Sequence, residues 1–298
     1  MARLGITHET HYSYERPVAF GPHRLLIRPR DSHAIRIVEA SLATSLPGQR
    51  RWSYDANGNC VCTFQPEGKA NHLTITSRLV IDRFPAPLTD SAVADPHTVS
   101  PIVYGREDRA VLDPFIRPAT EDADRVMLRW LREQMERPDE PALDFLLRLN
   151  ATIHDQFEYQ ARAAEGTQSP ALTVARGVGT CRDFAWLMVE ALRRLGYAAV
   201  FATGYLYSPG HGQNPGGGKI RGAGATHAWC EVFLPDLGWT EFDPTNGIAE
   251  SEDLIRVAAT RTPAEALPVS GTVIGDPGLS ELSVVVDVQQ LDGLCEAA

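Results

Sequence analysis

The feature that most constrains this chain is a short segment, residues 176–185, that places a cysteine at the start of a predicted helix. Upstream of the helix, Thr180 and Asp183 have the spacing of a capping box, so the first helical residue is predicted to be Cys181. Gly196 stands where a C-terminal cap is expected. Between these ends, apolar residues recur at the steps of three and four that mark one helical face: Phe184, Leu187, Met188, Ala191, Leu192 and Leu195.

The predicted position of Cys181 favours a reactive thiol. At the first turn of a helix a sulfur lies close to unpaired backbone N–H groups and to the positive end of the helix dipole, and both favour thiolate over thiol. Thiolate is the nucleophilic form. An isolated cysteine in a folded protein is also commonly a small buried apolar residue, so other parts of the chain must decide between the two interpretations.

Length and composition are those of a folded globular protein. The 298 residues are enough for two domains or one large one, and 43% of them are hydrophobic and 22% charged. The chain has 28 Lys and Arg against 38 Asp and Glu, a formal charge of −10, which argues against a nucleic-acid phosphate surface as partner.

Cysteine usage and hydropathy indicate the compartment. Five cysteines, an odd number spread over a long chain, do not form the pattern of a disulfide framework. No apolar run reaches the roughly 18 residues of a membrane span. Residues 1–10 become polar too early for a signal peptide. We therefore expect a cytoplasmic protein without membrane contact.

Residues 1–88 are predicted to form a β-rich N-terminal domain. Residues 55–59, Asp-Ala-Asn-Gly-Asn, carry a strong hairpin signal, and short strands at close spacing are typical of an all-β sandwich. The Pro-bearing residues 89–120 are predicted to be a linker to a second domain over residues 121–298. The first strand is predicted from alternating positions that share one face: Ile6, His8, Thr10, Tyr12 and Tyr14.

In the second domain the apolar period becomes helical, which makes the fold class α+β. Ser169-Pro170 predicts a short helix that ends at Gly177. Two earlier stripes are interpreted as core helices, formed by Met127, Trp130, Leu131 and Met135 and by Leu143, Leu146, Leu149, Ile153 and Phe157.

Two weaker motifs carry no predicted site. Cys60, Cys62 and His72 lack both the CxxC spacing and a second ligand pair of a metal site, so the two cysteines are interpreted as half-buried strand residues. The glycine-rich residues 216–219 fail as a phosphate loop because Ile220 stands where Ser or Thr would hold magnesium. We expect no metal and no cofactor.

A hairpin in the last third of the chain carries an imidazole and a carboxylate. Residues 226–234 alternate as a strand, residues 235–238 form a turn, and residues 239–243 form the partner strand. Counting back from the turn places His227 and Asp243 almost opposite one another on neighbouring strands.

Thiol, imidazole and carboxylate are together the parts of a cysteine acyl-transfer site. His227 would take the proton from Cys181 and later return it to the leaving amine, while Asp243 would bind the other ring nitrogen and fix the tautomer. The backbone N–H of Cys181 is a natural oxyanion donor. Trp229 shares a strand face with His227 and is predicted either to shield the His–Asp pair from water or to pack in the core.

Four motifs resemble the bacterial transglutaminase-like proteins of the papain-like cysteine enzyme superfamily. They are Gly-Thr-Cys-Arg-Asp-Phe-Ala (179–185), Thr-Gly-Tyr-Leu (203–206), Thr-His-Ala-Trp-Cys-Glu-Val-Phe-Leu-Pro (226–235) and Gly-Trp-Thr-Glu-Phe-Asp-Pro-Thr-Asn-Gly (238–247). The opening residues, with His11-Tyr12-Ser13-Tyr14, Pro17-Val18 and residues 25–30, resemble the β-rich N-terminal domain of that family.

This resemblance implies a β-sandwich followed by a papain-like transglutaminase core of helices packed on an antiparallel sheet. It implies Cys181 as nucleophile, His227 as base and Asp243 as the residue that orients it, without a metal. Residues 279–288 would then close the core sheet. Two segments depart from the family pattern: Tyr197-Ala198-Ala199 replaces a common Ile-Pro-Ala, and residues 261–265 lack a common Arg-Asp-Tyr run.

The acyl acceptor stays open at this level. A peptide or protein amide is the expected substrate; water as acceptor gives hydrolysis, which we favour, and an amine gives cross-linking transamidation. A non-catalytic binding protein of the same fold is the alternative of a different class, although all three site residues are present. A redox sensor is disfavoured because no resolving cysteine lies nearby, and Cys230 is predicted to face the opposite side of its strand for packing. The oligomeric state is not predicted.

Overall fold

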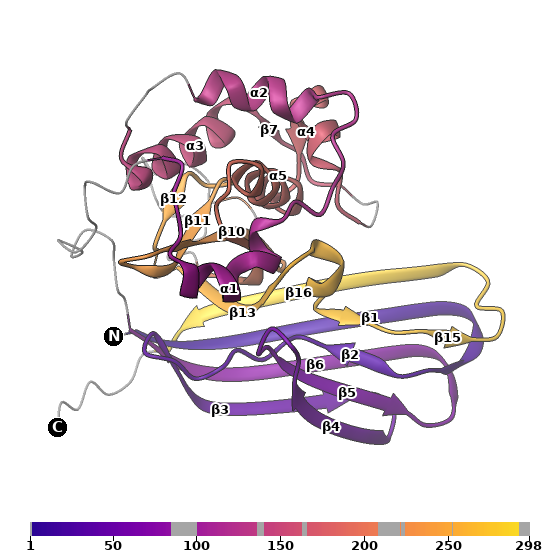
Figure 1. Ribbon diagram of the computed structural model, residues 1–298. Coiled ribbons are helices and arrows are strands. Elements are labelled where there is room, and N and C mark those ends of the chain that lie inside the picture. The colour runs from indigo at the N-terminus through magenta and orange to yellow at the C-terminus, as the bar shows by residue number, and fades with distance from the viewer. Residues whose placement is uncertain are drawn as a thin grey trace, which may run out of the picture.

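The computed structural model describes residues 2–84, 100–135, 140–162, 166–207, 221, 224–251 and 253–291. Figure 1 shows three layers: a group of helices, a central sheet, and a pair of sheets that contain the N-terminal strands. The predicted α+β class, with a strand-rich N-terminal part followed by helices packed on an antiparallel sheet, is confirmed.

The N-terminal part is built from two antiparallel sheets with an apolar core between them. One sheet has the order β15-β1-β6-β3, with β16 also paired to β1, and the other has the order β14-β2-β5-β4. Side chains from both sheets meet in one cluster, which includes Val18, Leu25, Phe64 and Ile75. The strands are β1 (Ala2–Phe20), β2 (His23–Leu25), β3 (Ile35–Thr44), β4 (Gly48–Tyr54), β5 (Cys60–Pro66), β6 (Lys69–Arg83), β14 (Val269–Ser270), β15 (Val273–Ile274) and β16 (Ser280–Gln290).

The predicted place of residues 279–288 is wrong. These residues form β16, which pairs with β1 from Leu4↔Gln290 to Tyr14↔Ser280 and so belongs to the N-terminal sheet rather than the core sheet. Strand alternation identified the segment as a strand but carries no information about which edge it joins. By pairing there, β16 covers the backbone groups of β1 that β6 leaves open.

The predicted linker is also wrong in part. Residues 106–116 form helix α1 (Arg106–Ile116), and Leu112 and Ile116 are buried in the same apolar cluster as the core helices. Pro114, one of the prolines of the predicted linker, lies inside this helix. The first part of the predicted linker, residues 89–99, lies outside the described residues, as do residues 216–219.

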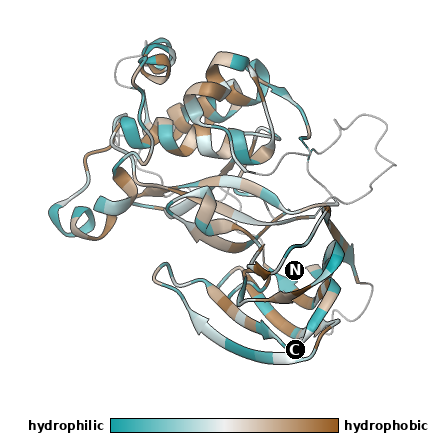
Figure 2. Ribbon diagram, turned by 90° about the vertical axis from the view of Figure 1, so that its right-hand side faces the viewer, coloured by the Kyte–Doolittle hydropathy of each residue, from teal (hydrophilic) through white to brown (hydrophobic). Residues whose placement is uncertain are grey.

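The second part of the chain is a helical layer packed on a five-stranded antiparallel sheet of order β12-β11-β10-β9-β13. Helix α5 packs on β10 and β9, and the two predicted apolar stripes lie in the cluster between helices and sheet. Figure 2 shows hydrophobic residues on the sheet and on the helices that face it. The elements are α2 (Val126–Gln134), α3 (Ala142–Gln156), β7 (Glu158–Tyr159), α4 (Pro170–Arg176), β8 (Val178–Gly179), α5 (Cys181–Arg194), β9 (Ala199–Leu206), β10 (His227–Leu234), β11 (Gly238–Asp243), β12 (Ile248–Ala249), β13 (Leu254–Thr260) and a 3₁₀ turn η2 (Pro263–Ala266).

The two parts share an interface on the face of the core sheet that α5 leaves free. Leu4 and Ile81 of the N-terminal sheet pack against Ile255 and Val257 of β13 in one buried cluster. Asn59 adds two hydrogen bonds to Ala259, donating from Nδ2 to its carbonyl (2.9 Å) and accepting at Oδ1 from its N–H (2.9 Å). A strand pattern alone does not predict these contacts, which fix the N-terminal sheets against the core.

Within the described part of the chain, no helix is long and apolar enough to cross a membrane.

Cys60 and Cys62 lie on β5 of one sheet, whereas His72 lies on β6 of the other and hydrogen-bonds Asn71. Burial raises the pKa of both thiols. The three residues are therefore not arranged as one ligand set.

Candidate active site

Helix α5 begins at Cys181, as the capping box predicts. The hydroxyl of Thr180 accepts from the backbone N–H of Asp183 (3.4 Å), and a carboxylate oxygen of Asp183 accepts from the backbone N–H of Thr180 (2.8 Å). Asp183 is fully buried and also accepts hydrogen bonds from Arg162 (2.8 Å) and from the N–H of Gln168 (2.7 Å). Burial alone would raise the pKa of Asp183, but these donors outweigh it and lower the pKa. The first turn of the helix, which carries a thiol only 8% exposed, is thus held by a buried carboxylate.

The approach to this helix needs a glycine. A Cβ added to Gly179 would lie 2.9 Å from both the Cβ of Asp183 and the ring of Phe184. Gly179 pairs with Tyr159 in the short parallel β7–β8 ladder. The chain can therefore pass close over the start of α5 and place Tyr159 beside the helix end that carries Cys181.

His227 and Asp243 form a buried pair. Nε2 of His227 lies 2.8 Å from Oδ2 of Asp243, and neither side chain is exposed to solvent. The two residues are diagonal neighbours: the β10–β11 register ends at Cys230↔Phe242, so Asp243 falls two positions short of the point opposite His227. Both side chains still project from the same face, because strand periodicity is two.

The hydrogen bond to Asp243 decides how the imidazole is oriented. A carboxylate only accepts, so the ring proton at this contact is on Nε2. Nδ1 is then left on the other side of the ring, where it is buried and has no hydrogen-bond partner among the described residues, while the Cys181 thiol lies near enough to raise the pKa of the ring. The structure thus brings Cys181, His227 and Asp243 together in that order.

Electrostatics favour the charged imidazolium. Burial alone would lower the pKa of His227, but the charge and hydrogen bond of Asp243, with those of Cys181, outweigh burial and raise the pKa to about 10. For Asp243 burial acts to raise the pKa, and the charge and hydrogen bond of His227, with donors from Asn246 and Thr245, lower it. Each partner stabilises the charged form of the other.

Trp229 packs both against His227 and in the core. Its ring stacks on that of His227, with centroids 6.2 Å apart and planes 28° from parallel. It is also fully buried in a cluster with Ala202, Leu206 and Leu254. Across the strand, Cys230 is buried in the core cluster under α5, as predicted for a packing residue.

Three residues near the site were missed by sequence reasoning: Tyr159, Arg221 and Asn246. Burial raises the pKa of Tyr159, and the charge of Cys181 raises it further, which places the phenol beside the thiol. The guanidinium of Arg221 lies over the Tyr159 ring, 5.9 Å from its centroid. Asn246 exchanges two hydrogen bonds with the Arg221 backbone and donates a third to Asp243 Oδ2 (2.7 Å). Of these three residues, only Asn246 had a sequence signal that pointed to the site, because it stands three residues beyond Asp243 in a Pro-Thr-Asn-Gly turn.

Residues 261–265, where the chain departs from the family pattern, also reach the site helix. Arg182, next to Cys181, donates from Nη2 to the carbonyl of Pro263 (2.7 Å) and lies over the ring of Phe201. This segment therefore supports the N-terminal end of α5 through its backbone.

The fold and the placement of a thiol, an imidazole and a carboxylate at the junction of α5 and the core sheet define a transglutaminase-like protein. Comparison with known proteins supports this class. Residues 129–244 match the family model of the transglutaminase-like superfamily, and residues 4–82 match that of the bacterial transglutaminase-like N-terminal region. These matches assign residues 129–244 to the transglutaminase-like superfamily and residues 4–82 to the N-terminal region of its bacterial members.

Similar proteins extend over nearly the whole chain. An uncharacterized protein of Mycobacterium tuberculosis is 29% identical over 98% of this chain and 94% of its own length. One from Mycobacterium leprae is 26% identical over 98% of this chain and 100% of its own length. The crystal structure of a candidate cysteine protease from Cytophaga hutchinsonii superposes with a TM-score of 0.70 at 19% identity, covering 98% of this chain and 91% of that one. This superposition establishes the fold.

Proposed function

We propose that this protein is a cysteine-dependent acyl-transfer enzyme that forms a thioester on Cys181 and most often passes the acyl group to water. The observation that carries the proposal is the 2.8 Å bond from His227 Nε2 to Asp243, because it leaves Nδ1 as the nitrogen that faces the Cys181 thiol. The substrate would be a peptide or protein amide, with Cys181 as nucleophile, His227 as base and Asp243 as the group that orients the ring.

In the first half-reaction, Nδ1 of His227 accepts the thiol proton and Sγ of Cys181 attacks the carbonyl carbon of the amide. The carbonyl oxygen becomes an oxyanion, which the backbone N–H of Cys181 at the helix N-terminus can stabilise. When the C–N bond breaks, the imidazolium gives its proton to the leaving amine. An acyl thioester remains on Cys181, and the imidazole is neutral again.

In the second half-reaction, an acceptor attacks the thioester and His227 removes its proton. Water gives a carboxylic acid, and an amine gives a new amide; in both cases the proton returns to the Cys181 sulfur. We favour water because, at about 55 M, it competes with any amine unless the site excludes it.

An acyl-transfer assay distinguishes these outcomes. The protein would be incubated with a glutamine-containing peptide and a labelled primary amine, with a Cys181→Ala variant as the control. Hydrolysis predicts ammonia release in excess of amine incorporation, and the variant should produce neither. Incorporation in excess of hydrolysis would instead assign transamidation.

A non-catalytic protein of the same fold is tested by alkylation. A Cys181 thiolate paired with the His227 imidazolium should react with iodoacetamide well below pH 7. A thiol that stays unlabelled until the protein is denatured would remove the basis for an enzyme.

A further inference from the structure

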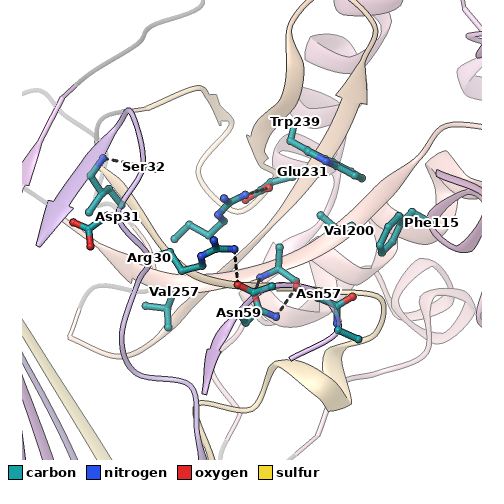
Figure 3. A pocket seen from close by; sticks show the side chains of 15 residues that line it. Arg30, Asp31, Ser32, Asn57, Asn59, Phe115, Val200, Glu231, Trp239 and Val257 are labelled. Atoms are coloured by element: carbon teal, nitrogen blue, oxygen red, sulfur yellow. Dashed lines mark hydrogen bonds and ion pairs between the residues drawn. The ribbon is translucent and has the colours of Figure 1, made fainter. Parts of the chain in front are cut away.

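A second pocket lies on the opposite side of the core sheet from α5, where the N-terminal part covers the sheet (Figure 3). It encloses about 490 Å³, and none of its lining residues is Cys181, His227 or Asp243. Its walls come from the loops at residues 30–35 and 56–59, from α1, and from strands β9, β10, β11 and β13. It is therefore a cavity separate from the candidate active site.

One wall of the pocket holds a buried carboxylate with an unused oxygen. The side chain of Glu231 on β10 is 1% exposed, and its Oε2 accepts from Nη1 of Arg256 (2.7 Å). Its Oε1 is buried and has no hydrogen-bond partner among the described residues. Leaving one oxygen of a buried carboxylate unsatisfied is costly, so a donor from a ligand would be stabilised there.

The surroundings of Glu231 favour a positive group as that donor. Glu241 lies directly opposite Glu231 on β11, and Glu250 accepts from the Glu241 backbone N–H. Burial raises the pKa of Glu241 well above its ordinary value, and the charges of Glu231 and Glu250 raise it further, against the opposing charges of Arg83 and Arg256. Three carboxyl groups therefore lie close together beside this end of the pocket, and an ammonium group bound there would favour their charged forms.

A second charge of opposite sign lines the same pocket. Arg30 donates from Nη1 to the carbonyl of Gly58 (2.9 Å), and its guanidinium lies over the ring of Tyr54, 4.8 Å from the centroid. Within the described ranges it forms no ion pair with an acidic side chain, and the Oδ1 of its neighbour Asp31 accepts from the backbone N–H of Ile37. The remaining guanidinium donors suit a carboxylate.

Apolar side chains fill the space between and beside these charges. Phe115 and Trp239 meet edge to face, with ring centroids 5.7 Å apart, and Val200 and Val257 line the same cavity. Figure 3 shows Glu231 and Trp239 on one side, Phe115 and Val200 on another, and Arg30 between Val257 and the Asn57–Asn59 turn. The pocket combines an acceptor for a cation, a donor for an anion and an aromatic surface.

We propose that this pocket binds a small zwitterion with an apolar side chain, namely an amino acid or a short peptide with free termini. The amino group donates to Oε1 of Glu231, the carboxylate accepts from Arg30, and the apolar side chain packs against Phe115 and Trp239. Because the walls come from both parts of the chain, an occupant would also stabilise their interface.

Three probes with the same phenyl group test this assignment by calorimetric titration: L-phenylalanine, phenethylamine, which lacks the carboxylate, and 3-phenylpropanoate, which lacks the amine. L-Phenylalanine is expected to bind about ten-fold more tightly than either singly charged probe, since each of those probes lacks one of the two charge-assisted hydrogen bonds. The Cys181→Ala variant should bind it equally well, whether or not the protein is an enzyme.

Two variants assign the two ends. Glu231→Gln should weaken L-phenylalanine to the affinity of 3-phenylpropanoate, and Arg30→Gln should weaken it to that of phenethylamine. Arg30 lies in a surface loop, so its variant provides the test even if Glu231→Gln unfolds on losing the Arg256 ion pair. Absence of binding, equal affinity for the three probes, or binding that neither variant changes would overturn the proposal, as would binding that is lost in Cys181→Ala.

Discussion

Asn246 donates a hydrogen bond to the same oxygen of Asp243 that accepts from His227, at 2.7 Å and 2.8 Å respectively. Oδ2 of Asp243 thus accepts from two side chains, and its Oδ1 accepts from the backbone N–H of Thr245 at 2.9 Å. Asn246 also forms two hydrogen bonds with the backbone of Arg221. The turn after β11 therefore connects the carboxylate to the surroundings of the thiol.

Replacing Asn246 should impair positioning of the imidazole. In Asn246→Ala, Asp243 loses one donor that lowers its pKa, so its hold on the His227 ring weakens. We expect kcat to fall on the order of ten-fold with little change in KM, and the alkylation rate of Cys181 below pH 7 to fall in parallel. Asn246→Asp is the matched control, since it keeps the size of the side chain but places a second negative charge beside Asp243. Unchanged alkylation of Asn246→Ala would show that the residue serves the turn alone.

The two buried cysteines of the core should differ sharply in reactivity. Cys181 interacts with His227 and raises the pKa of its ring, whereas Cys230 lies under α5, where burial raises the pKa of its thiol despite the opposing charge of Arg193. Of these two cysteines, iodoacetamide should therefore label Cys181 in the folded protein at pH 6, and Cys230 only after denaturation. Peptide mapping by mass spectrometry reports both sites in one sample, and a Cys230→Ala variant should react as the unmodified chain does. Labelling of Cys230 before Cys181 would contradict the assignment.

The buried His227–Asp243 pair should make stability depend on pH in the alkaline range. The pKa of His227 rises from an ordinary 6.5 to about 10 on folding, so the folded state binds the proton more tightly. This contribution is fully present below about pH 6.5 and is lost as the pH rises through about 10; it amounts to roughly a few kcal/mol. Urea unfolding at pH 6 and pH 10 should show a larger loss for the unmodified chain than for His227→Gln. Equal losses would mean that the ring is neutral in the folded protein.

Local signals predicted the parts of the site that local chemistry determines. The capping box of Thr180 and Asp183 fixed the start of α5, and the turn at residues 235–238 brought His227 and Asp243 onto adjacent strands. Tyr159 and Arg221 escaped prediction because they reach the site only through long-range contacts: a β7–β8 pairing and a hydrogen bond across 25 residues. A sequence pattern gives the element and its face, but not the partner that it meets.

The same limit explains why the last strand was misplaced, and it leads to a test. Truncation after Gly278 would remove β16 and leave the β1 edge from Leu4 to Tyr14 without a partner. An exposed edge of that length is a template for intermolecular pairing, so we expect a lower soluble yield and faster amide hydrogen exchange in β1. The edge strands of the core sheet are β12 and β13, and none of its strands comes from this segment. Its amides should therefore keep their protection from hydrogen exchange in the soluble fraction. Faster exchange in β9 and β13 instead would indicate that the last strand supports the core sheet, since β16 contacts β9 and its Val286 shares a buried cluster with Ile255 and Val257 of β13.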